Sequence, residues 1–263
     1  MVLTMSRVVA AFSPEANLKR KVRAHLRTLG FTKDEAGQLV APISSKDSIR
    51  TLHRVQRRER IRTQREFIKE RLRSFRQHFA AGTDIDAARV APRIELIDAE
   101  TWQSDLFRLA TLSWSVPVSA GFGRRLRYLV WDTYNDKLMG VIALGDPVFN
   151  LKARDDLIDW NVKDRAKRLV NMMDAYVLGA VPPYNRLLGG KLVACLVRTR
   201  EVRDDFATKY AGTRGIISKE KKEAQLVTVT TSSSLGRSSV YNRLKLGNQE
   251  YFAPIGFTGG WGH

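Results

Sequence analysis

The sequence predicts an α/β fold, in which a mixed β-sheet is flanked by helices and preceded by a basic helical N-terminal region. From residue 94 onward, apolar runs of strand length alternate with segments of helical periodicity, and the series includes an early β-hairpin. Upstream, the charge is strongly basic and apolar residues recur at helical spacing. We therefore expect two regions, residues 1–84 and residues 85–263, divided at the turn-rich segment after Gly82.

The N-terminal region contains two expected helices. The first ends near Gly30, a residue type that often follows a helix, and its apolar residues are Leu18, Val22, Leu26 and Leu29. The second begins at Asp47 or Ser48, which are suitable N-cap residues, and runs to about Phe79. One face of this second helix is apolar and is formed by Ile68, Leu72, Phe75 and Phe79.

The second region is expected to hold six strands. Each is a short apolar or β-branched run bounded by turn residues: 94–97, 126–131, 138–144, 174–181, 225–231 and 251–257. The turn Tyr134-Asn135-Asp136 joins the second and third strands into a hairpin. Helical segments separate the others, at 101–113, at the end of 148–172, at 187–199 and 201–210, and briefly around 240–244.

The charge is large and unevenly distributed. The formal net charge is +18, and the calculated isoelectric point is about 10.4. Residues 1–80 carry 19 of the 45 Lys and Arg residues but only 7 of the 27 Asp and Glu residues. Such a field attracts polyanions, so we expect contact with nucleic acid, although a basic surface that only keeps the protein in solution is the alternative.

Several protein classes are disfavoured by the composition. No apolar run is long enough to span a bilayer, and charged residues interrupt every apolar stretch near the N-terminus. Cys195 is the only cysteine, and the four histidines are scattered, so no zinc-type cluster is present. We expect a cytoplasmic protein that does not act in a membrane.

A turn that follows the strand at 174–181 is the first candidate site. Pro182-Pro183 ends this strand, and the helix at 187–199 begins close to two glycines and a lysine. Because a helix N-terminus presents unpaired N–H groups, the segment suits a phosphate, and its candidate ligands are Asn185, Arg186, Gly189, Gly190 and Lys191. A closely packed turn that needs its glycines only for backbone geometry is the alternative.

Aspartates near strand ends form a second candidate site. Converging carboxylates can hold Mg²⁺ or Mn²⁺ for phosphodiester chemistry, and the candidate metal ligands are Asp146, Asp156 and Asp174. Asp146, Asp174 and Tyr184 are the candidate catalytic residues, with Tyr184 as a nucleophile for strand cleavage. Loop aspartates more often cap turns and helices, and no spacing in this sequence singles out a metal-binding pair.

Two further groups could contact phosphates. Arginines crowd the long N-terminal helix, and the candidates there are Arg57, Arg58, Arg62 and Arg65. A Gly-Arg-Ser-Ser turn near the C-terminus adds a second group, namely Arg237, Ser238, Asn242 and Arg243. The alternatives are a solvated helix and an ordinary N-cap serine.

The order of a hairpin followed by alternating strands and helices resembles the GNAT superfamily of N-acetyltransferases. In that superfamily the turn after the fourth strand holds the pyrophosphate of acyl-CoA with a Gln/Arg-x-x-Gly-x-Gly/Ala motif. Arg186, Gly189 and Gly190 fit this pattern, but Lys191 stands in its last position. Pro182 and Pro183 also lack the N–H groups that would hold the pantetheine arm. We therefore expect a GNAT-like scaffold that does not bind acyl-CoA.

A closer resemblance extends from about residue 45 to the end. The phrases that carry it are GFGRRLRYLVWD, LMGVIALGDPVFNLKARDD, MDAYVLGAVPPYNRLLGGKLVA, REVRDDFATKY, TTSSSLGRSSVYNRL and GWGH. They are similar to the DruA family of the Druantia anti-phage defence systems. The resemblance implies defence against phage or foreign DNA, and relatives also lie in mobile elements. It brings no catalytic assignment.

These observations lead to one expected function and one alternative. We expect an anti-phage protein that binds nucleic acid, with DNA favoured, through its basic region and the GNAT-like cleft. Its expected partners are a helicase or other proteins of the same defence system. The alternative is an enzyme that cleaves DNA with a divalent metal, or modifies DNA, at the same cleft.

Overall fold

The computed structural model describes residues 13–42, 45–212, 224–233, 235–236, 238, 240–242 and 244–256. The chain divides into two units, Met1–Val55 and Gln56–His263. The first unit contains α1 (Pro14–Thr28) and a hairpin of β1 (Thr32–Lys33) and β2 (Leu39–Val40). The second unit contains the α/β sheet and every element from α3 onward. Helix α2 (Lys46–Thr63) runs across the division.

Helix α1 begins and ends at the signals that its sequence carries. The side chain of Ser13 accepts a hydrogen bond from the N–H of Ala16 at 3.2 Å, and Pro14 occupies the first turn. Gly30 follows the helix with a φ of +84°, as expected of its position. Leu18 and Val22 are exposed, and no residue of α1 is buried.

The long helix expected after residue 47 is interrupted once. It consists of α2, α3 (Arg65–Phe75) and the short 3-10 turn η1 (Arg76–His78). Gln64 separates α2 from α3, and its backbone at φ −95° and ψ 8° departs from helical values. The side-chain oxygen of Gln64 accepts a hydrogen bond from Arg108, so the interruption coincides with a contact to the next helix.

Helix α3 packs through an apolar face that differs in one residue from the expected one. Phe75 is buried, and Ile68 and Phe79 pack against the same cluster, as predicted. Leu72, however, is 47% exposed. The position that faces α4 is held by Arg71, whose Nε lies 3.0 Å from a carboxylate oxygen of Asp105, and Leu72 lies one residue further round the helix.

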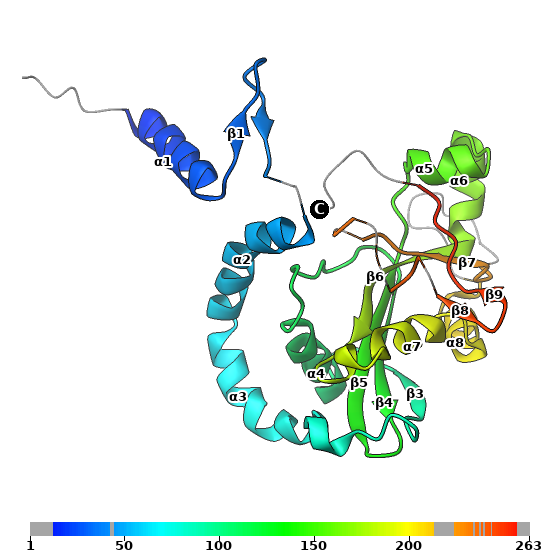
Figure 1. Ribbon diagram of the computed structural model, residues 1–263. Helices are drawn as coiled ribbons and strands as arrows, with labels where there is room; N and C mark the ends of the chain where they lie inside the picture. Colours follow the sequence, from blue (N-terminus) through cyan, green and yellow to red (C-terminus); the bar gives the residue numbers. More distant parts are fainter. Residues whose placement is uncertain are drawn as a thin grey trace, which may run out of the picture. The chain divides into compact units, whose positions relative to one another are not determined.

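A five-stranded mixed sheet forms the centre of the second unit. Its strands in spatial order are β3 (Pro92–Leu96), β4 (Arg125–Asp132), β5 (Lys137–Gly145), β6 (Met172–Ala180) and β7 (Thr228–Thr230). The first four are antiparallel, whereas β7 runs parallel to β6. This arrangement confirms the predicted mixed sheet flanked by helices, and the β4–β5 hairpin lies where the sequence placed it (Figure 1).

Helices cover both faces of the sheet. One face packs against α4 (Trp102–Thr111), and the other packs against α7 (Gly189–Leu196) and α8 (Arg200–Tyr210) (Figure 1). Strand β5 is shared by the two layers: Val141 belongs to the α4 cluster and Ile142 to the α7–α8 cluster. Because both faces of β5 are covered, its sequence is a continuous apolar run and does not alternate between apolar and polar residues.

The remaining elements are short. Between β5 and β6 lie α5 (Lys152–Leu157), α6 (Val162–Arg168) and η3 (Leu169–Asn171). Two further 3-10 turns are η2 (Gly82–Asp84), before β3, and η4 (Tyr184–Arg186), before α7. No helix within the described ranges combines the length and the apolar character needed to cross a membrane.

The last strand pairs with only part of its neighbour. Strand β7 contacts Met172–Asp174, and the rest of the β6 edge has no strand beside it among the described residues. Two hydroxyl groups bind carbonyl oxygens there: Thr231 donates to Ala175 at 2.9 Å, and Tyr241 donates to Leu178 at 3.0 Å. Side chains thus replace backbone partners along this stretch.

Two predicted elements near the C-terminus are wrong in the described part of the chain. Residues 240–242 form a turn rather than a helix, and residues 251–256 form no strand. A small hairpin of β8 (Lys245–Leu246) and β9 (Gln249–Glu250) lies between them. Tyr251 and Phe252 pack against the α7–α8 cluster, so their apolar character reflects packing and not strand pairing.

A matched pair of leucine variants tests the layered core. We expect Leu106→Ala in α4, which removes a fully buried side chain, to lower the free energy of unfolding by about 2–5 kcal/mol. Leu72→Ala in α3 removes an exposed one and should change it by about 0.5 kcal/mol or less. Urea denaturation followed by circular dichroism measures both. Equal losses would contradict the packing of α4 described above.

Candidate nucleic-acid interface

The four arginines predicted to contact phosphates are exposed at the α2–α3 junction. Arg57, Arg58 and Arg62 lie on α2, and Arg65 is the first residue of α3. Arg62 pairs with Glu59 at 2.6 Å, but the other three have no ion-pair partner among the described residues. Their neighbour Arg60 is turned inward and donates to the carbonyl of Val118 at 2.7 Å. The junction therefore presents three exposed guanidinium groups that remain available to an anion.

The predicted phosphate turn is anchored at its start by Tyr184. This side chain is 1% exposed, and its hydroxyl donates to Asp132 at 2.9 Å while it accepts from the Asn135 amide at 2.8 Å. Burial, reinforced by the Asp132 carboxylate, raises the pKa of Tyr184. Asp132 also accepts from the N–H groups of Ala91 and Tyr134. The network fastens the turn to the end of the β4–β5 hairpin.

The two glycines of this turn differ in their role. A Cβ on Gly189 would lie 2.6 Å from the carbonyl oxygen of Tyr184, so packing alone requires glycine there. A Cβ on Gly190 would meet nothing closer than Val240 at 3.9 Å. Asn185 and Arg186 are exposed, and Lys191 is half-buried. Of the two interpretations of this segment, a phosphate site and a closely packed turn, close packing explains the glycine at position 189. It does not explain Gly190.

Asp146 is held by an arginine that sequence reasoning missed. A carboxylate oxygen of Asp146 lies 2.6 Å from Nε of Arg124, and the other accepts from the Arg124 N–H at 3.0 Å. Arg124 also donates to the carbonyls of Val170 and Met172 at 2.6 and 3.1 Å. This pair joins the loop before β4 to the end of β5 and the start of β6. The sequence signal near it is Gly123, one residue earlier, which has a positive φ and where a Cβ would collide with the Asp146 carboxylate.

Asp174 lies at the same end of the sheet but has a different partner. It is opposite Gly145 in the register of β5 and β6, and it accepts a hydrogen bond from Thr230 at 2.8 Å. Burial raises the pKa of Asp174, although the Thr230 hydroxyl and the positive charge of Arg154 oppose that shift. Asp156 is exposed on α5. Among the described residues, no three His, Cys, Asp or Glu side chains are grouped to hold a metal ion.

The three candidate catalytic residues lie at two ends of one strand. Asp146 and Asp174 are near the start of β6, whereas Tyr184 follows its end. From Asp174 to Ala180 the strand rises by about 3.3 Å per residue, which separates the two ends by about 20 Å. The structure therefore brings Asp146 near Asp174 but does not bring Tyr184 to them.

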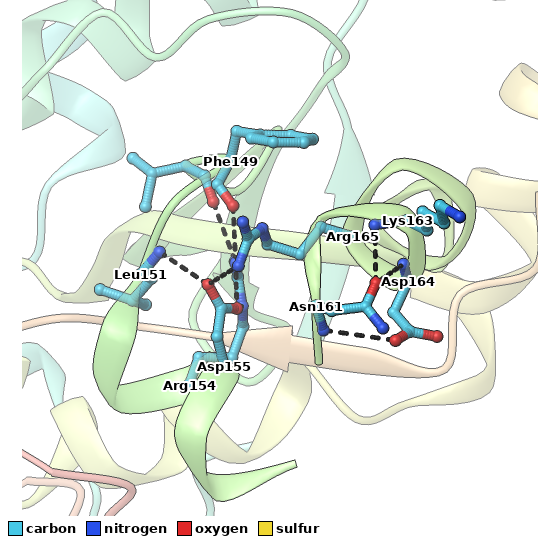
Figure 2. A network of polar contacts seen from close by, with 9 residues as sticks. Phe149, Leu151, Arg154, Asp155, Asn161, Lys163, Asp164 and Arg165 are labelled. Carbon is cyan, nitrogen blue, oxygen red and sulfur yellow. Dashed lines mark hydrogen bonds and ion pairs between the residues drawn. The ribbon is translucent and has the colours of Figure 1, made fainter. Parts of the chain in front are cut away.

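A buried ion network organises the segment between β5 and β6 (Figure 2). Asp155 accepts from Arg154 at 2.8 Å and from Arg165 at 3.0 Å, and all three side chains are largely buried. Arg154 also donates to the carbonyls of Val148 and Phe149, each at 2.9 Å. Burial alone would raise the pKa of Asp155, but the hydrogen bonds and the two arginine charges outweigh it, so the pKa lies below its ordinary value.

The C-terminal candidates are described only in part. Ser238 accepts a hydrogen bond from the N–H of Val240 at 3.2 Å, and its carbonyl accepts from the N–H of Asn242 at 3.1 Å. These contacts form a local turn. Arg237 and Arg243 lie outside the described residues.

Comparison with known proteins gives the family. A family profile described as Druantia protein DruA matches residues 44–263. The chain belongs to the DruA family. One DruA relative, the Druantia protein DruA of Escherichia coli (strain UMEA 4076-1), is 59% identical over 249 residues. The match covers 95% of this chain but 62% of that relative, so the chain spans less than two-thirds of its length. No solved structure matches the chain.

Substitution of Tyr184 tests its anchoring role. We expect Tyr184→Phe to lower the free energy of unfolding by about 1–3 kcal/mol, because Asp132 and Asn135 lose a buried partner. Tyr134→Phe is the matched control, since the Tyr134 ring is 38% exposed, and a change of about 0.5 kcal/mol or less is expected. Thermal and urea unfolding measure both variants. If Tyr184→Phe leaves the free energy of unfolding unchanged, the hydroxyl does not anchor the turn.

Two adjacent aspartates give a pH-dependent test. We expect Asp155→Asn to destabilise the fold by roughly 3 kcal/mol at pH 7, because it removes the charge between two buried arginines. The pKa of Asp155 is lower in the folded state than in the unfolded state. The contribution of its charge to the free energy of unfolding is therefore fully present above the unfolded-state pKa, and it is lost as the pH falls through the folded-state pKa. The difference from wild type should therefore shrink between pH 7 and pH 3. The exposed neighbour variant Asp156→Asn should match wild type at both pH values.

Proposed function

We propose that this chain is a nucleic-acid-binding component of a Druantia-type anti-phage defence system, acting on DNA in the cytoplasm. Family membership supports the defence role, since the E. coli relative carries the name of that system. We infer that it works with other proteins of the system, such as a helicase. Residues 1–84 act as the basic binding region and residues 85–263 as the α/β domain.

The exposed arginines at the α2–α3 junction carry this proposal. Arg57, Arg58 and Arg65 have no carboxylate partner among the described residues, although the exposed Glu59 and Glu66 lie beside them in sequence. Arginines that serve fold stability are usually paired or packed, as Arg60 and Arg154 are here. A strongly basic chain with unpaired guanidinium groups on one helical segment is suited to the phosphate backbone of DNA.

We further infer that the sheet is a GNAT-like scaffold that has no acyl-CoA chemistry. The antiparallel run from β3 to β6, the parallel β7 and the helix that follows β6 support this likeness. Two features argue against the cofactor. Pro182 and Pro183 offer no N–H groups, and Lys191 stands where the acyl-CoA motif has a small residue.

Charge removal at the junction tests the proposed function. We expect the triple variant R57Q/R58Q/R65Q to bind a short DNA duplex at least about tenfold more weakly at 50 mM salt. Its plot of log affinity against log salt should be shallower by roughly 2–3, because three phosphate contacts are lost. Fluorescence anisotropy with labelled DNA measures both quantities.

The control removes the same charge elsewhere. K152Q/K163Q/K167Q changes three exposed lysines of α5 and α6 and should bind nearly as wild type. If both triple variants weaken binding equally, only the net charge matters and the junction is not the interface. If the wild-type protein binds neither DNA nor RNA at 50 mM salt, the proposed function is wrong. DNA cleavage with Mg²⁺ or Mn²⁺ that disappears in Asp174→Asn would favour an enzyme instead.

A further inference from the structure

The turn between β6 and α7 ends in two exposed leucines. Leu187 is 50% exposed and Leu188 is 71% exposed, the second-largest exposed fraction among the large apolar side chains described. Both lie within residues 185–191, the segment that holds the predicted phosphate ligands. We propose that Leu187 and Leu188 form an apolar wedge that inserts between stacked base pairs of a bound DNA duplex. This inference rests on the proposed function and adds how the DNA is engaged.

The wedge is held on both sides by buried contacts. Before it, the hydroxyl of Tyr184 is fixed by Asp132 and Asn135. After it, Gly189 lies so close to the Tyr184 carbonyl that no larger residue fits. The N–H of Leu187 donates to that same carbonyl at 3.0 Å. The leucines therefore project from a turn that the protein's own contacts hold in place, which reduces the entropy lost on insertion.

The backbone of Leu188 supports a role beyond packing. Its φ is +61°, in the left-handed region that favours glycine or asparagine. The other described non-glycine residues with positive φ are polar, namely Glu100, Asp136 and Asp159. The carbonyl of Leu188 accepts from the N–H of Lys191 at 2.9 Å, so this backbone conformation begins α7, but that contact does not require the exposed apolar side chain found here. Strain of this kind is found where a side chain must be aimed at a ligand.

The groups beside the leucines select the kind of partner. Asn185 and Arg186 are exposed immediately before them, and Lys191 follows at the start of α7. Leucine side chains that enter a base step are typically accompanied by Arg, Lys or Asn contacts to the groove and backbone. An apolar pocket on another protein would not require flanking cations. The combination of an apolar tip with cationic neighbours fits a DNA duplex.

The test uses a variant that removes the wedge and relieves the backbone. L187S/L188N replaces both apolar side chains, and asparagine tolerates the left-handed conformation, so the fold should be retained. The matched control L157S/L246N makes the same chemical changes at two other exposed leucines. Short duplexes carrying 2-aminopurine at successive positions report unstacking as a rise in fluorescence. Fluorophores at the duplex ends report bending.

Wild type and the control should raise 2-aminopurine fluorescence and bend the duplex at saturating protein. L187S/L188N should still bind, about three- to tenfold more weakly, and give neither signal. R57Q/R58Q/R65Q should keep both signals at saturation, since it changes phosphate contacts only. The wedge proposal is wrong if saturated wild-type complexes show no unstacking, or if L187S/L188N unstacks the bases as wild type does. Either result would leave the proposal of DNA binding intact. Absence of any DNA binding would overturn both proposals.

The alternative role for the two leucines is a contact between copies of this chain. Sedimentation velocity without DNA should show the same species for wild type and L187S/L188N. If wild type forms a dimer that this variant loses, the leucines serve a protein interface and the wedge is wrong.

Discussion

The structure depends on the burial of β5 on both of its faces. Its side chains alternate between the α4 cluster and the α7–α8 cluster, so each layer is stabilised through the same strand. At Gly140 a side chain would collide with Val193 of α7 and with the backbone of β6, so the close approach of this helix also depends on one residue of β5. The aspartate pair and the predicted phosphate turn are positioned by the strand beside β5, because they lie at opposite ends of β6 (Figure 1).

The two ends of β6 are chemically different. At its start, carboxylates and arginines satisfy one another: Asp146 with Arg124, and Asp155 with Arg154 and Arg165. At its end, the polar groups of Tyr184, Asp132 and Asn135 are internal, while the cationic and apolar groups of the turn face outward. The charged side chains at the start of β6 therefore stabilise the fold, whereas the cationic side chains of the turn after β6 remain available to a partner. Buried ion networks of the first kind are costly to disturb and contribute structure more readily than chemistry.

Local patterns in the sequence predicted most of the sheet. The β4–β5 hairpin, the helix after Pro182-Pro183 and the C-cap at Gly30 each follow from spacing or turn residues within a few positions. The errors have a common cause in contacts between distant residues. Leu72 is exposed because Arg71 meets Asp105, and 251–256 is apolar because Tyr251 and Phe252 pack on the core. The partner of Asp146 lies 22 residues away, and no local pattern connects the two.

The hydroxyl groups on the outer edge of β6 have a consequence for the protein in solution. An unpaired strand edge is a template for sheet growth between molecules. Here Thr231 and Tyr241 occupy the carbonyl oxygens of Ala175 and Leu178, at the positions where an incoming chain would donate its N–H groups. Among the described residues, these two side chains protect the part of the β6 edge that β7 does not cover.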